Sequence, residues 1–367
     1  MELAETGQQA HFEVHLVDMA GDPCTTEQQV TAELRSLTHS SVTPTSVAPK
    51  TSDVYGVSYQ PNAQGRHKLS VVVNDVPVQG SPFLVYVRQA PHLLGRPVRV
   101  IKELNSPYMV AITSSGELVV SEDFKISIFS GDVKRIRSIS TTSVRSGIRR
   151  YKLDPYGVVV DEDSNIYLSD TESHRLSKFN SDGKLVKSAG GEGDKTGRFN
   201  NPRGIALSKD NNKLFVCDCT NQRIQVFDTN LKFIFGFGKQ GNGEGEMGHT
   251  ADLTFDPAGN LYVADSMYNR VQLFSTDGTY LRAFRILGCT PSKLPHLKGI
   301  HVDHDYVYVA ECWNNRVSVF HTSGAFITSF GGRGSGEGEL ENPNGITTDQ
   351  DGFLYVCDTY NNRIQII

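Results

Sequence analysis

One motif recurs five times in this chain at almost constant spacing, and it limits the folds open to the chain. Each copy has an apolar strand, a turn, a second strand ending in Asp or Glu, a four-residue loop, and an arginine that opens a third strand. The arginines follow one another at intervals of 48, 47, 46 and 47 residues. A fixed period of this size, filled with short strands, indicates a radial or stacked repeat fold. The acid–arginine pairs are Asp170–Arg175, Asp218–Arg223, Asp265–Arg270, Glu311–Arg316 and Asp358–Arg363.

Each period has room for four antiparallel strands. Four strands of about five residues, with turns such as residues 276–278, fill roughly 40–50 residues, the length of a propeller blade. No segment has sustained helical periodicity, which excludes a helical solenoid. A sixth, degenerate copy spans residues 106–129, with a shorter loop, Lys125 in place of the arginine, and the acid–arginine pair lost. Six copies predict six blades.

The last copy reaches Ile367 with only three of its four strands. Residues 97–104 precede the first copy and stand where a fourth strand would be. An unpaired strand would leave an open sheet edge. We therefore expect residues 97–104 to complete the last blade and to close the ring.

Residues 1–90 form a different module. Segments 11–17, 54–59, 68–73 and 83–87 read as strands, and residues 73–76 (Val-Asn-Asp-Val) read as a hairpin turn. About seven short strands in a segment of this length predict an immunoglobulin-like sandwich. The expected organisation is all-β: a sandwich at 1–90, a Pro/Gly linker at 91–96, and a six-bladed propeller at 97–367.

Sequence motifs in both modules resemble those of known families. Residues 10–23, 54–73 and 80–87 resemble a filamin repeat, and residues 97–367 resemble NHL repeats. The NHL-like wording is Asn-Pro-x-Gly-Ile at 201–205 and 342–346, Leu-Tyr-Val-x-Asp at 261–265 and 354–358, and Asn-x-Arg-Ile-Gln at 221–225. This domain order is similar to the C-terminal half of the TRIM-NHL proteins.

The resemblance implies a recognition function. In that family the propeller would recruit an mRNA or a protein substrate to a ubiquitin ligase, and in several members one propeller face binds RNA. No run of Cys and His ligands could build a zinc site here. We expect any ubiquitin chemistry of the family to lie outside these residues.

The four-residue loops between second and third strands should gather on one face, together with the links between blades. We call the loops at residues 171–174, 219–222, 266–269, 312–315 and 359–362 the loop ring. The repeated acid–arginine pairs are expected to brace these loops, whereas variable tips on a repeated frame usually carry specificity. Aromatic and amide side chains there suit either stacked bases or a peptide, although packing against a neighbouring blade is the simpler interpretation. The candidate tip residues are His174, Asn221, Tyr268, Asn269, Trp313 (the single tryptophan), Asn314, Tyr360 and Asn361.

A basic cluster lies in the link into the second blade. Residues 131–152 hold seven Lys or Arg and one Asp, a local charge of +6 in a chain of net charge −5. Such polarisation favours an anionic partner, although a solvated, flexible loop would explain it too. We predict that Arg145, Arg149, Arg150 and Lys152 contact RNA phosphates, with a protein partner as the alternative.

Other motifs point away from catalysis. The glycine runs at 236–248 and 331–339 lack a following Gly-Lys-Ser/Thr and a helix start, so they read as links between blades rather than phosphate loops. His296, His301 and His304 cluster but do not recur in other blades, and no nucleophile motif is present. We expect no metal, no cofactor, no small-molecule substrate and no enzymatic activity. The scattered cysteines, with no apolar membrane-crossing run and no leader, predict a cytoplasmic location without a membrane partner.

Overall fold

The computed structural model is all-β. It describes residues 2–5, 9–16, 23, 28–37, 42–61, 65–78, 81–88, 95–142, 144–146, 149–208, 210, 212–286, 296–303 and 305–367. The chain separates into two compact units, one of Met1–Leu94 with Asp349–Phe353, and one of Gly95–Thr348 with Leu354–Ile367. Most of the expected linker at 91–96 lies outside the described residues.

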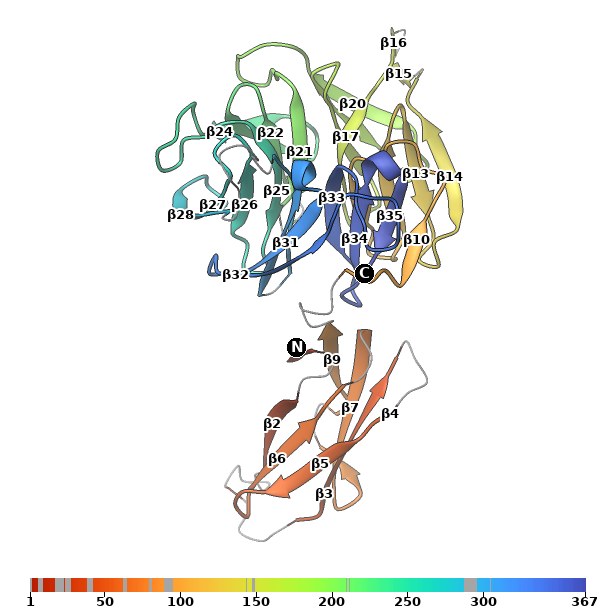
Figure 1. The fold of residues 1–367 in the computed structure, drawn as a ribbon, viewed down its shortest axis with the longest axis vertical. Coiled ribbons are helices and arrows are strands. Elements are labelled where there is room, and N and C mark those ends of the chain that lie inside the picture. Colours follow the sequence, from red (N-terminus) through yellow and green to blue (C-terminus); the bar gives the residue numbers. More distant parts are fainter. Residues whose placement is uncertain are drawn as a thin grey trace. The chain divides into compact units, whose positions relative to one another are not determined.

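The first unit is a two-sheet sandwich (Figure 1). Its apolar residues alternate along the strands and meet between the sheets, with Leu34, Tyr59, Leu69 and Val85 at the centre. Asn74 and Asp75 adopt positive φ angles of 49° and 65° in the expected hairpin turn. One sheet contains β1 (Glu2–Glu5), β9 (Phe83–Arg88), β7 (Gly65–Val73), β3 (Val30–Ser36), β4 (Val42–Thr43) and β8 (Val76–Pro77), and the other β2 (Ala10–His15), β6 (Val54–Tyr59) and β5 (Thr45–Pro49). The described residues thus form nine strands where about seven were expected.

The second unit consists of four-stranded antiparallel sheets set around a common centre (Figure 1). Blade 1 contains β11 (Val110–Ile112), β12 (Leu118–Glu122), β13 (Lys125–Phe129) and β14 (Arg135–Ser140). Blade 2 contains β17 (Pro155–Val160), β18 (Ile166–Asp170), β19 (Arg175–Phe179) and β20 (Leu185–Gly190). Blade 3 contains β21 (Pro202–Leu207), β22 (Lys213–Asp218), β23 (Arg223–Asp228) and β24 (Phe233–Phe237).

The remaining blades repeat this order. Blade 4 contains β25 (Thr250–Phe255), β26 (Leu261–Asp265), β27 (Arg270–Phe274) and β28 (Tyr280–Arg285). Blade 5 contains β29 (Leu297–Asp303), β30 (Tyr306–Glu311), β31 (Arg316–His321) and β32 (Phe326–Gly331). Blade 6 contains β33 (Pro343–Thr348), β34 (Leu354–Asp358), β35 (Arg363–Ile366) and β10 (Arg99–Ile101). Short 3-10 turns, η2 (Cys312–Asn314) and η3 (Thr359–Asn361), form two of the loop-ring tips.

The ring closes as the sequence predicted. Strand β10 pairs antiparallel with β35, so that Arg99 lies opposite Ile366 and Ile101 opposite Ile364. Ile101 is buried in this sheet. The sixth blade therefore combines strands from both ends of the propeller unit, and no blade keeps an open edge at this joint.

The first strand of each blade lines the central channel. Glycine in the Asn-Pro-x-Gly motif allows neighbouring first strands to approach closely, because a Cβ atom on Gly204 would lie 2.4 Å from the Cα atom of Asp252 in the next blade. Inside the channel, apolar first-strand residues enclose a cavity of about 320 Å³. Most of the residues that line the channel are apolar, and Asp252 and His301 are the ionisable residues among them.

Two expectations about the first blade need correction. Blade 1 retains a shortened acid–base pair, since the Lys125 ammonium lies 3.0 Å from the buried Glu122 carboxylate. The basic cluster is not confined to the link: Lys134 precedes β14 and Arg135 and Arg137 lie on it, at the turn between third and fourth strands and so on the opposite rim. The sequence could not separate these groups because they are adjacent in the chain.

Candidate recognition surface

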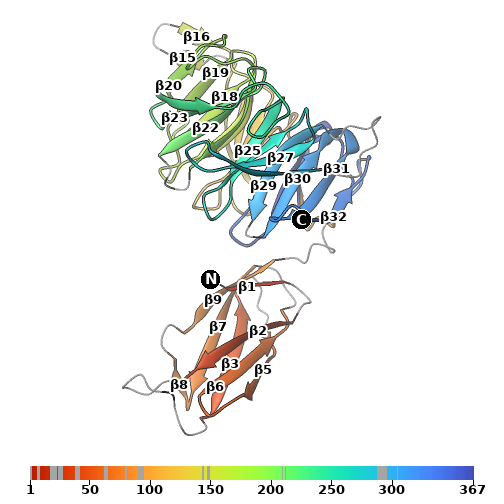
Figure 2. The ribbon, with the colours of Figure 1, turned by 90° about the vertical axis from the view of Figure 1, so that its left-hand side faces the viewer.

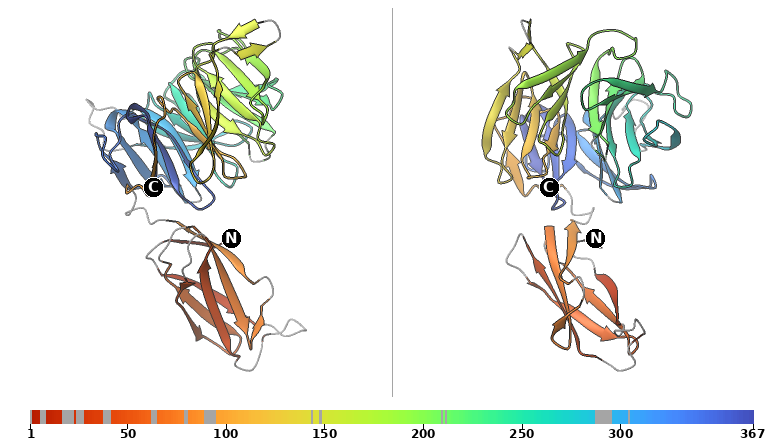
Figure 3. Two further views of the ribbon diagram at one scale, coloured as in Figure 1. Left: turned by 90° about the vertical axis from the view of Figure 1, so that its right-hand side faces the viewer. Right: turned by 180° about the vertical axis from the view of Figure 1, so that it is seen from behind.

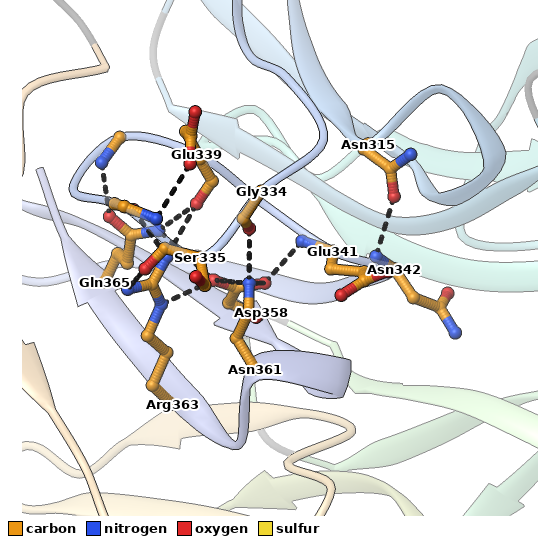
Figure 4. Close-up of polar contacts among 12 residues, drawn as sticks. Asn315, Gly334, Ser335, Glu339, Glu341, Asn342, Asp358, Asn361, Arg363 and Gln365 are labelled. Carbon is orange, nitrogen blue, oxygen red and sulfur yellow. Dashed lines mark hydrogen bonds and ion pairs between the residues drawn. The ribbon is translucent and has the colours of Figure 1, made fainter.

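A buried carboxylate organises the loop of blade 6 (Figure 4). Asp358 accepts hydrogen bonds from Arg363 Nε at 2.6 Å and from the Asn361 side-chain amide at 3.0 Å. It also accepts the Gln365 side-chain amide at 3.2 Å and the backbone amide of Glu341 at 2.7 Å. The four donors satisfy a carboxylate with no solvent exposure, which burial would otherwise destabilise.

The same arginine ties the loop to the link that precedes its blade. Arg363 donates to the backbone carbonyls of Ser335, Gly336 and Glu339 at 2.7–2.8 Å. The amide of Gln365 donates to the Glu339 carbonyl as well, at 2.6 Å. Loop and link therefore form one rigid frame.

Blades 3 and 4 repeat the frame with the same residue types. Arg223 lies 2.7 Å from Asp218, and Arg270 lies 2.9 Å from Asp265. Gln225 and Gln272 donate to the link carbonyls of Arg198 and Glu246. The glutamines were not singled out from sequence, although the repeated Arg-x-Gln spacing was a signal for them.

In blades 5 and 2 a different set of donors binds the buried acid. The Glu311 carboxylate accepts hydrogen bonds from Arg316 Nε at 3.0 Å, from the Asn314 side-chain amide at 2.6 Å, and from the Ser318 hydroxyl. In blade 2, Asp170 accepts the Ser173 hydroxyl and backbone amide. Arg175 lies opposite Asp170 in the strand register.

Most of the asparagine side chains proposed for ligand contacts form hydrogen bonds within their own loops instead. Asn221, Asn314 and Asn361 all donate to the buried acid of their own loop. His174 and Asn269 occupy the left-handed position before the arginine, with φ of 56° and 50°. The three asparagines therefore brace their own loops, His174 Nδ1 accepts the Asn201 backbone amide at 2.9 Å, and Asn269 contributes a backbone turn.

The second residue of the loop points outward on three consecutive blades. Met267 is 55% exposed, Trp313 63% and Tyr360 66%. Tyr268 is instead half-buried, with the Arg270 guanidinium 5.2 Å from its ring centroid. The sequence therefore identified two of the exposed tips, and in blade 4 the neighbour Met267 takes that role.

The imidazole of His296 covers one face of the Trp313 ring. The indole stacks on this imidazole with centroids 4.6 Å apart and ring planes inclined by 20°. Burial, followed by repulsion from Lys298 and Arg203, lowers the pKa of His296 to about 4. The imidazole is thus neutral at physiological pH and the pair acts as an aromatic ledge.

The link into blade 2 contains an unexpected hairpin. Strands β15 (Val144–Ser146) and β16 (Arg149–Tyr151) pair with Arg145 opposite Arg150, and the hairpin projects beyond the blade sheets (Figures 2 and 3). The structure describes the backbone of Arg145, Arg149 and Arg150, whereas their side chains lie outside the described part. The link leaves from the loop-ring side, since the Thr141 amide donates to the Phe124 carbonyl in the turn between second and third strands.

Lys152 ends this link and is exposed. Its ammonium lies 3.6 Å from the centroid of the Phe124 ring. This cation–π contact fixes the stem of the hairpin and leaves the charge on the surface.

Two further cations lie at the loop-ring end of the channel. Arg203 and Lys298 are each the second residue of a first strand, β21 and β29, directly after a link. Their charged ends lie 5.9 Å and 5.6 Å from the ring centroid of Tyr156 on β17. Sequence analysis missed them because 95 residues separate them and only ring closure brings them together.

The histidine cluster does not assemble a metal site in the described residues. His301 is partly buried and its Nε2 atom lies 2.8 Å from the Thr348 hydroxyl, while His304 lies outside the described residues. Over the described part, no group of three or more His, Cys, Asp or Glu side chains is placed to hold a metal ion. Cys217, Cys219, Cys312 and Cys357 are buried free thiols. Among the described helices, none is long and apolar enough for a membrane crossing.

Comparison with family models matches both modules. Residues 1–84 match the filamin/ABP280 repeat, and residues 199–227 and 340–367 match the NHL repeat. The protein brain tumor of Drosophila melanogaster is 25% identical over 138 residues, covering 37% of this chain and 12% of that protein. NHL repeat-containing protein 3 of Mus musculus is 28% identical over 151 residues, covering 36% of this chain and 43% of that protein. The matches therefore span less than half of these relatives.

Solved structures agree on the fold. Virginiamycin B lyase from Staphylococcus aureus has a TM-score of 0.51 at 14% identity, covering 73% of this chain and 88% of the lyase. A Bacteroides thetaiotaomicron protein of unknown function has a TM-score of 0.58 at 13% identity, covering 99% of this chain and 95% of that protein. At these identities the likeness concerns the fold alone.

Proposed function

We propose that this chain, a filamin repeat followed by NHL repeats, is a macromolecular recognition module that binds RNA on the loop-ring face of its propeller. Bound RNA would be recruited for post-transcriptional regulation, as the resemblance to TRIM-NHL proteins implies. The filamin-like sandwich would space or orient the propeller. The chemistry of one face carries the proposal.

The observation that carries it is the Trp313 ledge beside cations on the same face. An exposed ring with a rigid support presents a free π-face to a base, and base–aromatic stacking contributes about 1–3 kcal/mol per base. The basic hairpin and Lys152 would neutralise phosphates along the chain of the RNA. A repeated frame that holds the loop tips keeps the Trp313 ring in position without a ligand.

Charge reversal in the hairpin tests the proposal. Arg149→Glu with Arg150→Glu should abolish retention of a pool of short structured RNAs at physiological salt. Removing two phosphate contacts should also reduce the slope of log affinity against log salt by about 1.4 for single-stranded RNA. The matched control is Lys134→Glu with Arg135→Glu, which changes the same charge on the opposite rim. Unchanged binding by the hairpin variant, or equal losses in both variants, would exclude the proposed surface.

A protein partner is the competing function, and the exposed tips of Met267, Trp313 and Tyr360 favour it. Such a row of apolar and aromatic side chains has the composition of a protein interface centre. In this case the chain would recruit substrates to a ubiquitin ligase. This alternative predicts no salt-sensitive RNA retention and a specific captured protein that is lost on Trp313→Ala.

A further inference from the structure

The channel mouth gathers positive charge without an obvious counter-charge. Arg203 and Lys298 approach the same Tyr156 ring from blades 3 and 5. Arg203 Nε donates to the Asn201 side-chain oxygen at 3.1 Å, and the Tyr156 hydroxyl donates to the Asn344 oxygen at 3.0 Å. Within the described residues, neither cation forms an ion pair with a carboxylate.

This arrangement is costly for the empty protein. Burial, followed by repulsion from Arg203, lowers the pKa of Lys298 to about 8. The neighbouring thiols of Cys219 and Cys312 do not supply negative charge, since burial raises the pKa of each. Two like charges held near one ring and partly withdrawn from water are stabilised when an anion enters between them.

The mouth opens onto the loop ring. Both cations follow links that are bonded to the loops, and the Thr171 hydroxyl donates to the Pro202 carbonyl next to Arg203. His296, two residues before Lys298, is the imidazole under Trp313 and is electrostatically coupled to both cations. A pair of cations and an aromatic ledge are therefore neighbours on one surface.

Charge number identifies the kind of anion. A phosphodiester within an RNA chain carries a single negative charge and has chain on both sides. A terminal phosphate monoester carries about −1.5 to −2 at pH 7, which matches an Arg–Lys pair, and it has chain on one side only. The guanidinium fork can bind two of its oxygens while the ammonium contacts the third.

We infer that Arg203 and Lys298 form a site for the terminal phosphate of an RNA, with the terminal base stacked on the ledge of Trp313 and His296. The inference deepens the proposed function and rests on it, because it assigns an RNA end to the loop-ring face. The juxtaposition of cations and aromatic rings favours a nucleotide over a phosphorylated peptide, which offers no base to stack.

The test compares one single-stranded RNA in four forms: 5′-phosphorylated, 3′-phosphorylated, unphosphorylated at both ends, and circular. Fluorescence of Trp313, the single tryptophan, reports occupancy of the ledge. At least one phosphorylated end should bind about tenfold more tightly than the unphosphorylated form, the loss expected when a charged hydrogen-bonded group is absent. Arg203→Met and Lys298→Met should each remove this preference, while Lys298→Arg should retain most of it.

Each other outcome overturns the inference in a recognisable way. Equal binding of all four forms, with the hairpin variant still defective, would exclude the terminal-phosphate site and leave the proposed RNA function standing. Absence of binding for every form would remove both. Quenching of Trp313 fluorescence by a phosphoserine peptide but not by the phosphorylated RNA would assign the Arg203–Lys298 pair to a protein ligand instead. The unfolding midpoints of Arg203→Met and Lys298→Met, measured by circular dichroism, must match that of the native protein. Lys298→Arg keeps the site testable if either variant fails to fold.

Discussion

Trp313 lies on His296 with ring centroids 4.6 Å apart, and the residue as a whole remains 63% exposed. A large aromatic ring that is held from below and open above is ordered before any ligand arrives, so little side-chain freedom is lost on binding. The loops that carry this ring and its neighbours are fixed by buried carboxylates.

Removing one carboxylate of the frame should destabilise the propeller strongly. Asp265 is fully buried and Arg270 is almost so, with 2.9 Å between them. Asp265→Ala leaves a buried guanidinium without its anion, a change that costs about 3–5 kcal/mol. Urea unfolding followed by Trp313 fluorescence reports on the propeller and should show a lower midpoint.

Asp277→Ala is the matched control, because Asp277 is an exposed turn residue of the same blade. Its unfolding midpoint should stay close to that of the native chain. Equal midpoints for the Asp265 and Asp277 variants would contradict a structural role for the buried acids.

The closing strand should govern the stability of blade 6. Ile101 is 4% exposed and pairs with Ile364 across β10 and β35. Ile101→Ala should cost about 2–5 kcal/mol, the range for truncating a buried aliphatic side chain. Hydrogen exchange should accelerate in β35 more than in β26 of blade 4. The control Val98→Ala changes an exposed side chain of the same segment, and unaltered exchange in β35 of the Ile101 variant would show that the ring does not depend on this joint.

The channel should make stability depend on pH. Burial raises the pKa of Asp252 from its ordinary 3.8 to about 7, against hydrogen bonds from the amides of Ile300 and Leu253 that lower it. Between these two pKa values the folded state therefore holds a proton that the unfolded state has lost. The stabilisation from the protonated Asp252 carboxyl is complete below about pH 4. It falls by about 1.4 kcal/mol per pH unit up to the folded pKa near 7.

Asp252→Asn should abolish this decline, so thermal unfolding midpoints of the variant and the native chain should diverge in favour of the variant between pH 5 and pH 7. An exposed acid, Glu244, gives the matched control Glu244→Gln. Parallel pH profiles for the native and Asp252→Asn proteins would refute a protonated carboxyl in the channel.

The ring was predictable because its signal is local to each repeat. The fixed five-residue step from Asp358 to Arg363 reflects a bond within one loop, and the missing fourth strand of the last copy pointed to residues 97–104. Within the loops the sequence was less informative. Met267 rather than Tyr268 faces solvent, and the Arg270 guanidinium lies 5.2 Å from the centroid of the Tyr268 ring, a contact that periodicity does not show.

Features that join distant segments were missed for a related reason. Gln365 binds the Glu339 carbonyl of a link 26 residues earlier, and its role depends on how that link folds back. Arg203 and Lys298 meet only because the blades close around an axis. The basic cluster misled because neighbours in sequence, Arg137 and Arg145, belong to an outer strand and to a projecting hairpin.

RNA affinity of one aromatic-tip variant and one outer-strand control is the sharpest test of recognition through the loop ring. Trp313→Ala with Tyr360→Ala removes the exposed rings of adjacent blades, whereas Phe326→Ala removes a 55% exposed ring from the outer strand β32. With a structured RNA pool at two salt concentrations, the tip variant should bind at least about tenfold more weakly, as expected for the loss of two stacked bases, and Phe326→Ala should bind like the native chain. Equal RNA affinity of the tip variant and the native chain would contradict recognition through the loop ring.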